Sequence, residues 1–340
     1  MATIKDVAKL AGVSTSTASR AMHDSETISE ATKERVRKAM VELDYSPNYS
    51  AQNLVNRKSN TVGIVLPVRE NQNSLGYNPF FMQIIQGISS VCSENEYMVS
   101  LVTGHSDEEL RKNTQTLIRS GNVTKLIFLY SKKGDLAFEF AKEQSSVSCL
   151  VVGQAFDAPS PRIRYVDNNN YQAGKDVASF LIDKGYNHIC FAYTNLDELV
   201  QSERYNGFSV SMAEQGKSAS ILKLSEGDDK NSQVLADFLE EHPDVQAFVA
   251  SDDVLAIHIQ RLLKQVNLPV KEMGLVGFNN SFITEIAKPP LTSVEIFPYQ
   301  LGEAAARLVL ADQLSASPEN TVIIPHQIIQ RETSPRIWLR

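Results

Sequence analysis

The feature that most constrains the fold is a long alternation of apolar runs and amphipathic helical segments, which begins at residue 61 of this 340-residue chain. The runs are almost continuously apolar, as in TVGIVLP (61–67), KLIFLY (125–130) and AFVAS (247–251). Such runs are typical of parallel strands whose sheet is covered by helices on both faces. The alternation occurs twice, with a join near 163–167, so the sequence predicts an α/β body of two lobes with parallel sheets.

The first sixty residues follow a different pattern, that of three short helices. Thr3 begins a capping box ahead of a helix expected at 4–11, and Gly12 is placed to end that helix. Ser14 is placed to cap a second helix after only a short turn, and Ser29 to cap a third of about fifteen residues. Two helices joined by so short a turn make an all-α helix-turn-helix head.

The three helices of this head are expected to pack through one apolar stripe each. The inward residues are Val7, Leu10, Ala11, Ala18, Ala21, Met22, Val36, Met40 and Leu43. The outward residues are Thr15, Ser16, Ser19 and Arg20 on the second helix, and Lys33, Arg35, Arg37 and Lys38 on the third. The second helix therefore presents short hydroxyls followed by one arginine, and the third presents cations to solvent or phosphate.

An outward face of this kind suits the major groove of DNA. Short hydroxyls and a helix N-terminus bind phosphate, and the guanidinium of Arg20 can grip guanine through two hydrogen bonds. Charge agrees weakly, since residues 1–60 hold nine Lys and Arg against seven Asp and Glu while the whole chain carries −7. The alternative is a solvated polar face on a small helical domain, which the helical pattern alone leaves open.

Residues 2–54, ATIKDVAKLAGVSTSTASRAMHDSETISEATKERVRKAMVELDYSPNYSAQNL, resemble the DNA-binding head of the LacI/GalR family of transcriptional regulators, including its YSPN linker start. The resemblance implies that Thr15, Ser16 and Arg20 read base edges. It also implies a following hinge helix that pushes Leu54 between base steps in the minor groove. The DNA-binding residues implied in full are Thr3, Ser14, Thr15, Ser16, Thr17, Ser19, Arg20, Ser29, Tyr45, Asn48 and Leu54.

Some of these assignments have alternatives. Thr17, Ser19 and Ser29 resemble contacts to the DNA backbone or helix caps more than base contacts. Leu54 could instead be a linker leucine that packs on its own domain, and Val55 stands where some members of the family carry a basic residue.

The resemblance extends over essentially the whole chain and implies a two-lobed, periplasmic-binding-protein-like body in which the chain crosses three times between the lobes. The implied domains are a head at 1–46, a hinge helix and linker at 47–60, and a body at 61–340, with an N-lobe at about 61–163 and 294–323 and a C-lobe at about 164–293 and 324–334. The run VIIPHQIIQR (322–331) is expected as one strand that returns through the first lobe and finishes in the second.

Open parallel sheets bind ligands beyond the carboxyl ends of their strands, so the cleft between the lobes is the expected effector site. The resemblance implies that Arg204 and Asn279 grip ligand hydroxyls or carboxylates. Aspartate is usual at the position of Asn279, but an amide both donates and accepts, so hydroxyl binding is retained. The candidate effector-binding residues are Tyr77, Phe81, Tyr130, Asp167, Asn168, Tyr193, Arg204, Ser251, Asp252, Phe278, Asn279 and Phe297.

Aromatic rings mixed with Asn, Asp and Arg suit a neutral saccharide better than a purine, although a single ring such as Phe81 or Phe297 could simply pack a lobe core. Within the family the chain is similar to maltose-type regulators of Gram-positive bacteria, which implies a repressor with maltose or a maltodextrin as inducer. A head that reads one half-site implies a homodimer on pseudo-palindromic operator DNA. Another effector, a corepressor, or a global catabolite-control role with a phosphocarrier protein stay open.

Two alternatives belong to other classes: a cytoplasmic sugar-binding protein, or a carbohydrate enzyme on an α/β scaffold. No nucleophile elbow, Walker loop or dinucleotide fingerprint occurs, and the six histidines show no metal or triad spacing. The adjacent pairs Asp228/Asp229 and Asp252/Asp253 are unsuited to converge on one bond. A transport binding protein would need a signal peptide and no DNA head. We therefore expect no enzyme activity, cofactor or metal.

The cellular setting is also an expectation. No apolar run approaches the length of a membrane helix, and Met1 leads into a charged amphipathic segment rather than a signal peptide. Three dispersed cysteines favour a reducing compartment. We expect a cytoplasmic, nucleoid-associated protein without a membrane partner.

Overall fold

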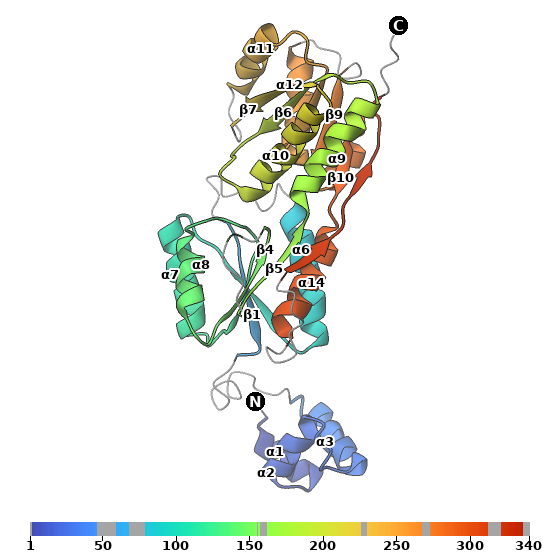
Figure 1. Cartoon of the computed structure of the whole chain (residues 1–340). Coiled ribbons are helices and arrows are strands. Elements are labelled where there is room, and N and C mark those ends of the chain that lie inside the picture. The colour runs from blue at the N-terminus through green and yellow to red at the C-terminus, as the bar shows by residue number, and fades with distance from the viewer. Residues whose placement is uncertain are drawn as a thin grey trace. The chain divides into compact units, whose positions relative to one another are not determined.

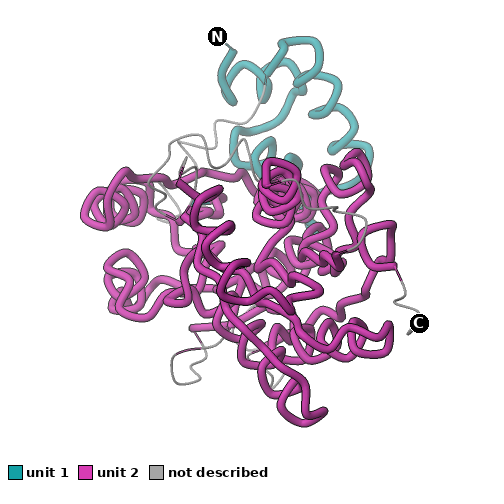
Figure 2. Tube along the Cα trace, turned by 90° about the horizontal axis from the view of Figure 1, so that it is seen from above, with its two compact units in different colours: residues 1–59 teal, residues 60–340 magenta. Residues whose placement is uncertain are grey.

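The computed structural model describes residues 2–45, 59–67, 79–154, 156, 162–225, 230–266, 273–311 and 321–335 of the chain. The chain divides into two compact units, Met1–Ser59 and Asn60–Arg340, which Figure 2 colours separately. The first unit holds the head and the second holds the body, and each has a hydrophobic core of its own. Among the described helices, none is long and apolar enough to cross a membrane.

The head consists of the three predicted helices, α1 (Ile4–Ala11), α2 (Thr15–Met22) and α3 (Glu30–Glu42). The carboxylate of Asp6 accepts hydrogen bonds from the backbone N–H of Thr3 at 2.8 Å and from its hydroxyl at 2.7 Å. Gly12 ends α1 in the left-handed conformation, with φ 65, and Ser14 Oγ accepts from the Thr17 N–H at 3.1 Å to cap α2. These local capping signals explain why the sequence predicts the helix-turn-helix correctly.

The core of the head is built from small residues, so the three helices lie close together. The buried core residues are Val7, Ala11, Ala21, Val36 and Ala39, with Ala18 also buried. The expectation that Leu10 faces inward is wrong, because Leu10 is 47% exposed and Ala8 is buried instead. A helix of only two turns has room for one narrow stripe, and Leu10 lies beside it.

Lys33 is a second correction in the head. It was expected to face solvent or phosphate, but it is buried, with Nζ 3.2 Å from Asp24 Oδ1 and 2.8 Å from Glu30 Oε1. Arg37 Nη2 donates to the same Asp24 carboxylate at 2.9 Å. The two cations thus hold the turn between α2 and α3, where Asp24 has a left-handed φ of 54.

The first lobe of the body is a six-stranded parallel sheet in the order β11-β5-β4-β3-β1-β2. Its strands are β1 (Thr61–Val65), β2 (Met98–Val102), β3 (Lys125–Phe128), β4 (Ser148–Val152), β5 (Ile163–Asn168) and β11 (Thr321–Ile324). One face is covered by α6 (Pro79–Glu94) and α14 (Pro298–Leu310), the other by α7 (Asp107–Arg119) and α8 (Leu136–Glu143), as Figure 1 shows. Because both faces are covered, the central strands are continuously apolar.

The second lobe has the same plan, with strands in the order β12-β10-β9-β8-β6-β7. They are β6 (His188–Tyr193), β7 (Ser218–Lys223), β8 (Ala247–Ala250), β9 (Gly274–Phe278), β10 (Thr292–Glu295) and β12 (Gln327–Ile329). The helices are α9 (Asn170–Asp183) and α10 (Leu199–Glu214) on one face, α11 (Asn231–Glu241) and α12 (Asp253–Gln265) on the other, and the short α13 (Ile283–Ile286). All pairs are parallel except β12 with β10. The predicted fold class, a helix-turn-helix head with a two-lobed α/β body, is confirmed.

Two glycines bring α9 and α10 into direct backbone contact. A Cβ on Gly174 would lie 2.0 Å from the carbonyl oxygen of Arg204, and one on Gly207 would lie 1.8 Å from that of Tyr171. Only glycine permits this approach. The two glycines therefore fix the position of the α10 backbone at Arg204 relative to α9.

The chain crosses between the two lobes three times, from β5 to α9, from β10 to α14, and from β11 to β12. Strand β5 stays in the first sheet as far as Asn168 and β10 stays in the second as far as Glu295, so both crossings fall a few residues after the expected lobe boundaries. The single strand expected at 322–331 is two strands, because the chain changes sheets at Pro325 and His326. Proline has no N–H to continue a ladder.

Candidate nucleic-acid interface and effector cleft

The outward face of α2 is open for a ligand. Thr15, Ser16 and Arg20 are exposed, and the guanidinium of Arg20 has no hydrogen bond or ion pair with any described residue. Thr17 and Ser19 are half-buried. The Ser14 hydroxyl lies 2.8 Å from Ser16 Oγ and 2.8 Å from Thr17 Oγ1, so these hydroxyls first organise the N-terminus of the helix.

The other predicted DNA-binding residues lie on the edges of the head. Thr3 is exposed at the start of α1, and Ser29 is exposed at the start of α3, where its hydroxyl lies 3.0 Å from Thr32 Oγ1. Tyr45 is half-buried against the head core, which favours a partly structural role for its ring. Asn48 and Leu54 lie outside the described residues, as does most of the predicted hinge and linker at 47–60.

Between the lobes is a cleft with a cavity volume of ≈ 250 Å³, at the carboxyl ends of the strands of both sheets. The predicted effector-binding residues that line it are Phe81, Tyr130, Asp167, Asn168, Arg204, Ser251, Asp252 and Asn279. Three others, Tyr193, Phe278 and Phe297, do not line it, and Tyr77 lies outside the described residues. The cleft is where the sequence places it, since polar residues that follow parallel strands meet at one edge.

Arg204 is the most constrained side chain in the cleft. It is 4% exposed, its Nε donates to Asn170 Oδ1 at 2.9 Å, and its Nη1 donates to the Ser251 carbonyl at 2.7 Å. Burial lowers the pKa of Arg204 to about 10, partly offset by the neighbouring carboxylates, so the group stays charged at neutral pH. A charged donor held by two hydrogen bonds presents its remaining N–H groups in a fixed direction.

The ring of Phe278 packs against the guanidinium of Arg204 and does not line the cleft. The guanidinium carbon lies 4.3 Å from the centroid of the ring, within the range of a cation–π interaction. The ring is fully buried in the core of the second lobe. Tyr193 likewise packs against that core, and Phe297 begins α14 with a left-handed φ of 52. Aromatic residues near strand ends therefore divide into cleft and core in a way that strand position alone does not reveal.

Asn170 links two of the predicted residues and was missed by the sequence reasoning. Its Nδ2 donates to Asp167 Oδ1 at 3.0 Å, while its Oδ1 accepts from Arg204. Burial raises the pKa of Asp167 to about 7, and the Asn170 bond and the Arg204 charge oppose that rise. The signal was present, since Asn170 belongs to the polar run DNNN (167–170), which begins in the last two residues of β5.

Asn168 has a different position from the one expected of an effector contact. It borders the cleft, but its Nδ2 donates to the carbonyls of Ile296 at 3.1 Å, Ile324 at 3.0 Å and Pro325 at 3.4 Å. Those carbonyls belong to the second and third crossovers, and Asn168 itself ends the first. The amide N–H groups of Asn168 therefore connect the three crossovers to one another. These segments are distant in the sequence and meet only in the folded body.

Two hydroxyls line the cleft: that of Ser251 in the second lobe is buried without a hydrogen-bond partner among the described residues, and that of Tyr130 in the first lobe faces the Asp135 carboxylate. Buried polar atoms are rarely left unpaired in proteins, so the Ser251 hydroxyl is available to a molecule that occupies the cleft. Burial and the negative charges of Asp135 and Asp107 raise the pKa of Tyr130 far above its ordinary value, so its hydroxyl stays a donor.

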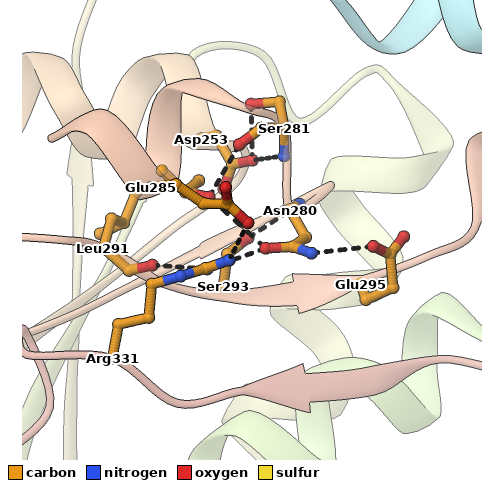
Figure 3. Close-up of polar contacts among 9 residues, drawn as sticks. Asp253, Asn280, Ser281, Glu285, Leu291, Ser293, Glu295 and Arg331 are labelled. Carbon is orange, nitrogen blue, oxygen red and sulfur yellow. Dashed lines mark hydrogen bonds and ion pairs between the residues drawn. The ribbon is translucent and has the colours of Figure 1, made fainter.

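The pair Asp252/Asp253 separates in the structure. Asp252 lines the cleft and caps α12 by accepting from the Leu255 N–H at 2.8 Å. Asp253 instead accepts from Ser281 N–H at 2.7 Å and from Ser293 Oγ at 2.5 Å, within the polar cluster shown in Figure 3. Two carboxylates with such different partners do not act on one bond, which removes the catalytic interpretation of this pair.

The sequence also missed much of the outer cleft. The missed residues are Asp107, Ser131, Lys132, Asp135, Asn195, Asp197, Glu198 and Gln201. Most follow β2, β3 or β6, so the rule that polar residues after strands face the cleft could have found them. The sequence does not separate them from ordinary surface residues, because a polar loop is also the usual connection at the surface of a protein.

An exposed helix-turn-helix and a two-lobed body with a polar cleft define a class of protein, the DNA-binding regulator that carries its own ligand-binding body. Residues 3–48 match the model of bacterial regulatory proteins of the lacI family, and residues 178–334 match a periplasmic binding protein-like domain. The chain is 34% identical over 290 residues to the HTH-type transcriptional regulator MalR of Streptococcus pneumoniae serotype 4, across 82% of this chain and 84% of that protein. The chain belongs to the lacI family.

Two further relatives cover nearly the whole chain. MalR of Staphylococcus xylosus is 30% identical over 343 residues, which is 99% of each protein. The solved complex of the transcriptional regulator CelR with cellobiose is 26% identical, with a TM-score of 0.72 across 98% of this chain and 100% of that chain. The protein is thus a DNA-binding transcriptional regulator, as the sequence of the head predicts, and not an enzyme.

Proposed function

We propose that this regulator is a repressor whose operator affinity falls when maltose or a maltodextrin binds between its lobes. It acts as a homodimer on a pseudo-palindromic operator, with the head at 1–46, a hinge helix and linker at 47–60 and the body at 61–340. Its place is the cytoplasm, on the nucleoid, because operator DNA is there.

The observation that carries a sugar effector is that hydroxyls from both lobes line one cleft, that of Tyr130 from the first lobe and that of Ser251 from the second. A sugar hydroxyl both donates and accepts, so it can satisfy each of them. Arg204 and Asn279 add a fixed donor and an amide at the same place. A ligand that satisfies groups on both lobes binds better when the lobes are close together, so it favours a closed arrangement.

Coupling to DNA follows from linkage. If the closed lobes disorient the two hinge helices of a dimer, the sugar lowers operator affinity by the ratio of its affinities for the two arrangements. Maltose is favoured over other sugars because two relatives carry the name MalR, and the CelR complex shows a disaccharide bound in a related chain.

The test is an operator-binding assay with a sugar panel. An operator is first selected from random DNA with the full chain, and a labelled fragment is titrated with the protein in the presence of glucose, maltose, maltotriose, cellobiose or lactose. Maltose or maltotriose should weaken binding about tenfold or more, in the usual range of allosteric coupling. Arg204→Met should bind the operator equally well and respond to no sugar. Operator binding that no sugar in the panel alters would overturn the saccharide effector.

A further inference from the structure

The cleft runs from the hinge to the free edges of the two sheets. In the first sheet the crossovers leave from β5 and β11 at one end of the strand order, and β2 is at the other end. In the second sheet β12 and β10 are at the hinge end and β7 at the other. Cleft residues that follow β5, β8 and β9 therefore lie nearer the hinge than those that follow β2, β3 and β6.

The residues near the hinge form an inner part of the cleft. They are Asp167, Asn170, Arg204, Ser251 and Asn279, all of them less than a tenth exposed. The residues far from the hinge form what we call the rim: Asp107, Lys132 and Asp135 in the first lobe, and Asn195, Asp197 and Glu198 in the second. Apart from Asp135, the rim side chains are partly or fully exposed, so a ligand there stays in contact with water.

The rim of the second lobe is held in shape by one buried side chain, that of Gln201. It is 7% exposed, its Oε1 accepts from the Thr194 N–H at 3.1 Å and the Asn195 N–H at 3.2 Å, and its Nε2 donates to Glu198 Oε2 at 2.9 Å. Asn195 Oδ1 in turn accepts from the Asp197 N–H at 3.0 Å. A loop held by a buried side chain presents its polar groups in one arrangement, so less conformational entropy is lost when a ligand binds.

Among the residues that the structure describes, the rim has no free positive charge. Its one cation, Lys132, has Nζ 2.8 Å from Asp107 Oδ2, and the remaining charged groups are the carboxylates of Asp135, Asp197 and Glu198. Carboxylates accept hydrogen bonds from sugar hydroxyls but repel phosphate. Tyr130 lies on the same loop after β3 as Lys132 and Asp135, and all three line the cleft, so a ligand in the inner part can extend toward the rim.

On the basis of the sugar effector proposed above, we propose that the rim is a second sugar subsite. The first ring of an uncharged oligosaccharide lies in the inner part, and its second ring contacts the rim. Gln201 is the positioning residue that holds the rim of the second lobe, and the rim selects for two or more rings and against phosphorylated sugars.

The test compares the affinities of the full chain for glucose, maltose, maltotriose and glucose 6-phosphate by isothermal titration calorimetry. Wild-type protein should bind maltose about tenfold or more tightly than glucose, and glucose 6-phosphate about tenfold or more weakly than glucose. Gln201→Leu should reduce the gain from the second ring to about threefold or less while changing glucose affinity by less than about twofold.

A matched control is Gln215→Leu at the other end of α10, whose amide bonds to Ser179 and Ser211 away from the cleft. It should keep the full gain from the second ring. Should Gln201→Leu fail to fold, Glu198→Gln, which keeps the loop and removes one rim charge, should raise affinity for glucose 6-phosphate relative to glucose. No change in that ratio would count against the rim.

The outcomes separate the two proposals. Equal wild-type affinity for glucose and maltose, or a Gln201→Leu variant that loses both affinities equally, overturns the second subsite and leaves the sugar effector standing. Wild-type protein that binds no sugar of the series overturns the sugar effector and the rim with it.

Discussion

Replacing Asn168 with leucine should destabilise the body of the protein even when no sugar is present. The amide of Asn168 donates to carbonyls of the second and third crossovers from the end of the first, at 3.1 Å to Ile296 and 3.0 Å to Ile324. Leucine has a similar size but no donor, so one buried and one partly buried carbonyl lose their partner. The substitution therefore tests the hinge role of Asn168 against the effector contact that the sequence predicted.

The magnitude follows from those two bonds. A buried polar group left without a partner costs roughly 1 to 3 kcal/mol, so the loss of two partners should lower the free energy of unfolding by about 2 to 6 kcal/mol. For a unit of this size the corresponding decrease in Tm is about 4 to 15 °C.

The assay is thermal unfolding of the full chain by calorimetry, with and without maltose. Asn206→Leu is the matched control, because Asn206 is an exposed amide on α10 with a single long bond of 3.4 Å to Glu203. Its Tm should change by less than about 2 °C. An unchanged Tm for Asn168→Leu together with lost sugar binding would refute the hinge role and restore the effector contact.

Three further substitutions test the head and the cleft. Arg20→Ala should relax operator preference at one base pair by roughly 1 to 3 kcal/mol on a panel of single-base operator variants, and a uniform loss across the panel would place Arg20 on phosphate alone. Lys33→Met should leave the salt dependence of operator binding, the slope of log affinity against log salt concentration, unchanged, because two carboxylates hold Lys33. Lys38→Met should lower the magnitude of that slope by about one. A lower magnitude for Lys33→Met would show that Lys33 reaches phosphate. Burial raises the pKa of Asp167 to about 7 from its usual 3.8, so the folded chain keeps a proton that the unfolded chain loses, and stability falls as pH rises between these values. Asp167→Asn should therefore reduce the difference in Tm between about pH 5 and about pH 7.5, and an undiminished difference would contradict the raised pKa.

The parts of the molecule that the sequence predicts well are those with local signals. Ser14, Gly12 and the alternating apolar runs act within a few residues, so the helix-turn-helix and the covered parallel sheets follow from the sequence. The cleft follows from a rule about strand ends, which places Asp167 and Ser251 in one region without their partners, whereas Arg204 on α10 is implied by the family resemblance.

The parts that the sequence does not predict depend on contacts between distant segments. Asn168 has its hinge role because the chain returns twice, more than a hundred residues later, to place carbonyls beside it. Lys33 is buried because the turn after α2 brings Asp24 back over α3. Gln201 resembles any polar residue in a helix until the loop before it is seen to fold around its amide. In each case the partner is chosen by the fold, not by spacing along the chain.

The polar cluster of Figure 3 gives the cleft a direct path to the second crossover. Asn279 lines the cleft with a φ of 100, and Asn280 follows it with a φ of 45. Asn280 Nδ2 donates to Glu295 Oε2 at 2.8 Å, and Glu295 Oε1 accepts from the N–H of Phe297, where the chain enters α14, at 2.6 Å. Left-handed backbone at a residue other than glycine costs of order 1 to 3 kcal/mol and persists only where its surroundings hold it. Asn280 therefore connects a residue that lines the cleft, Asn279, to the second crossover at Glu295 and Phe297 through one hydrogen-bonded side chain.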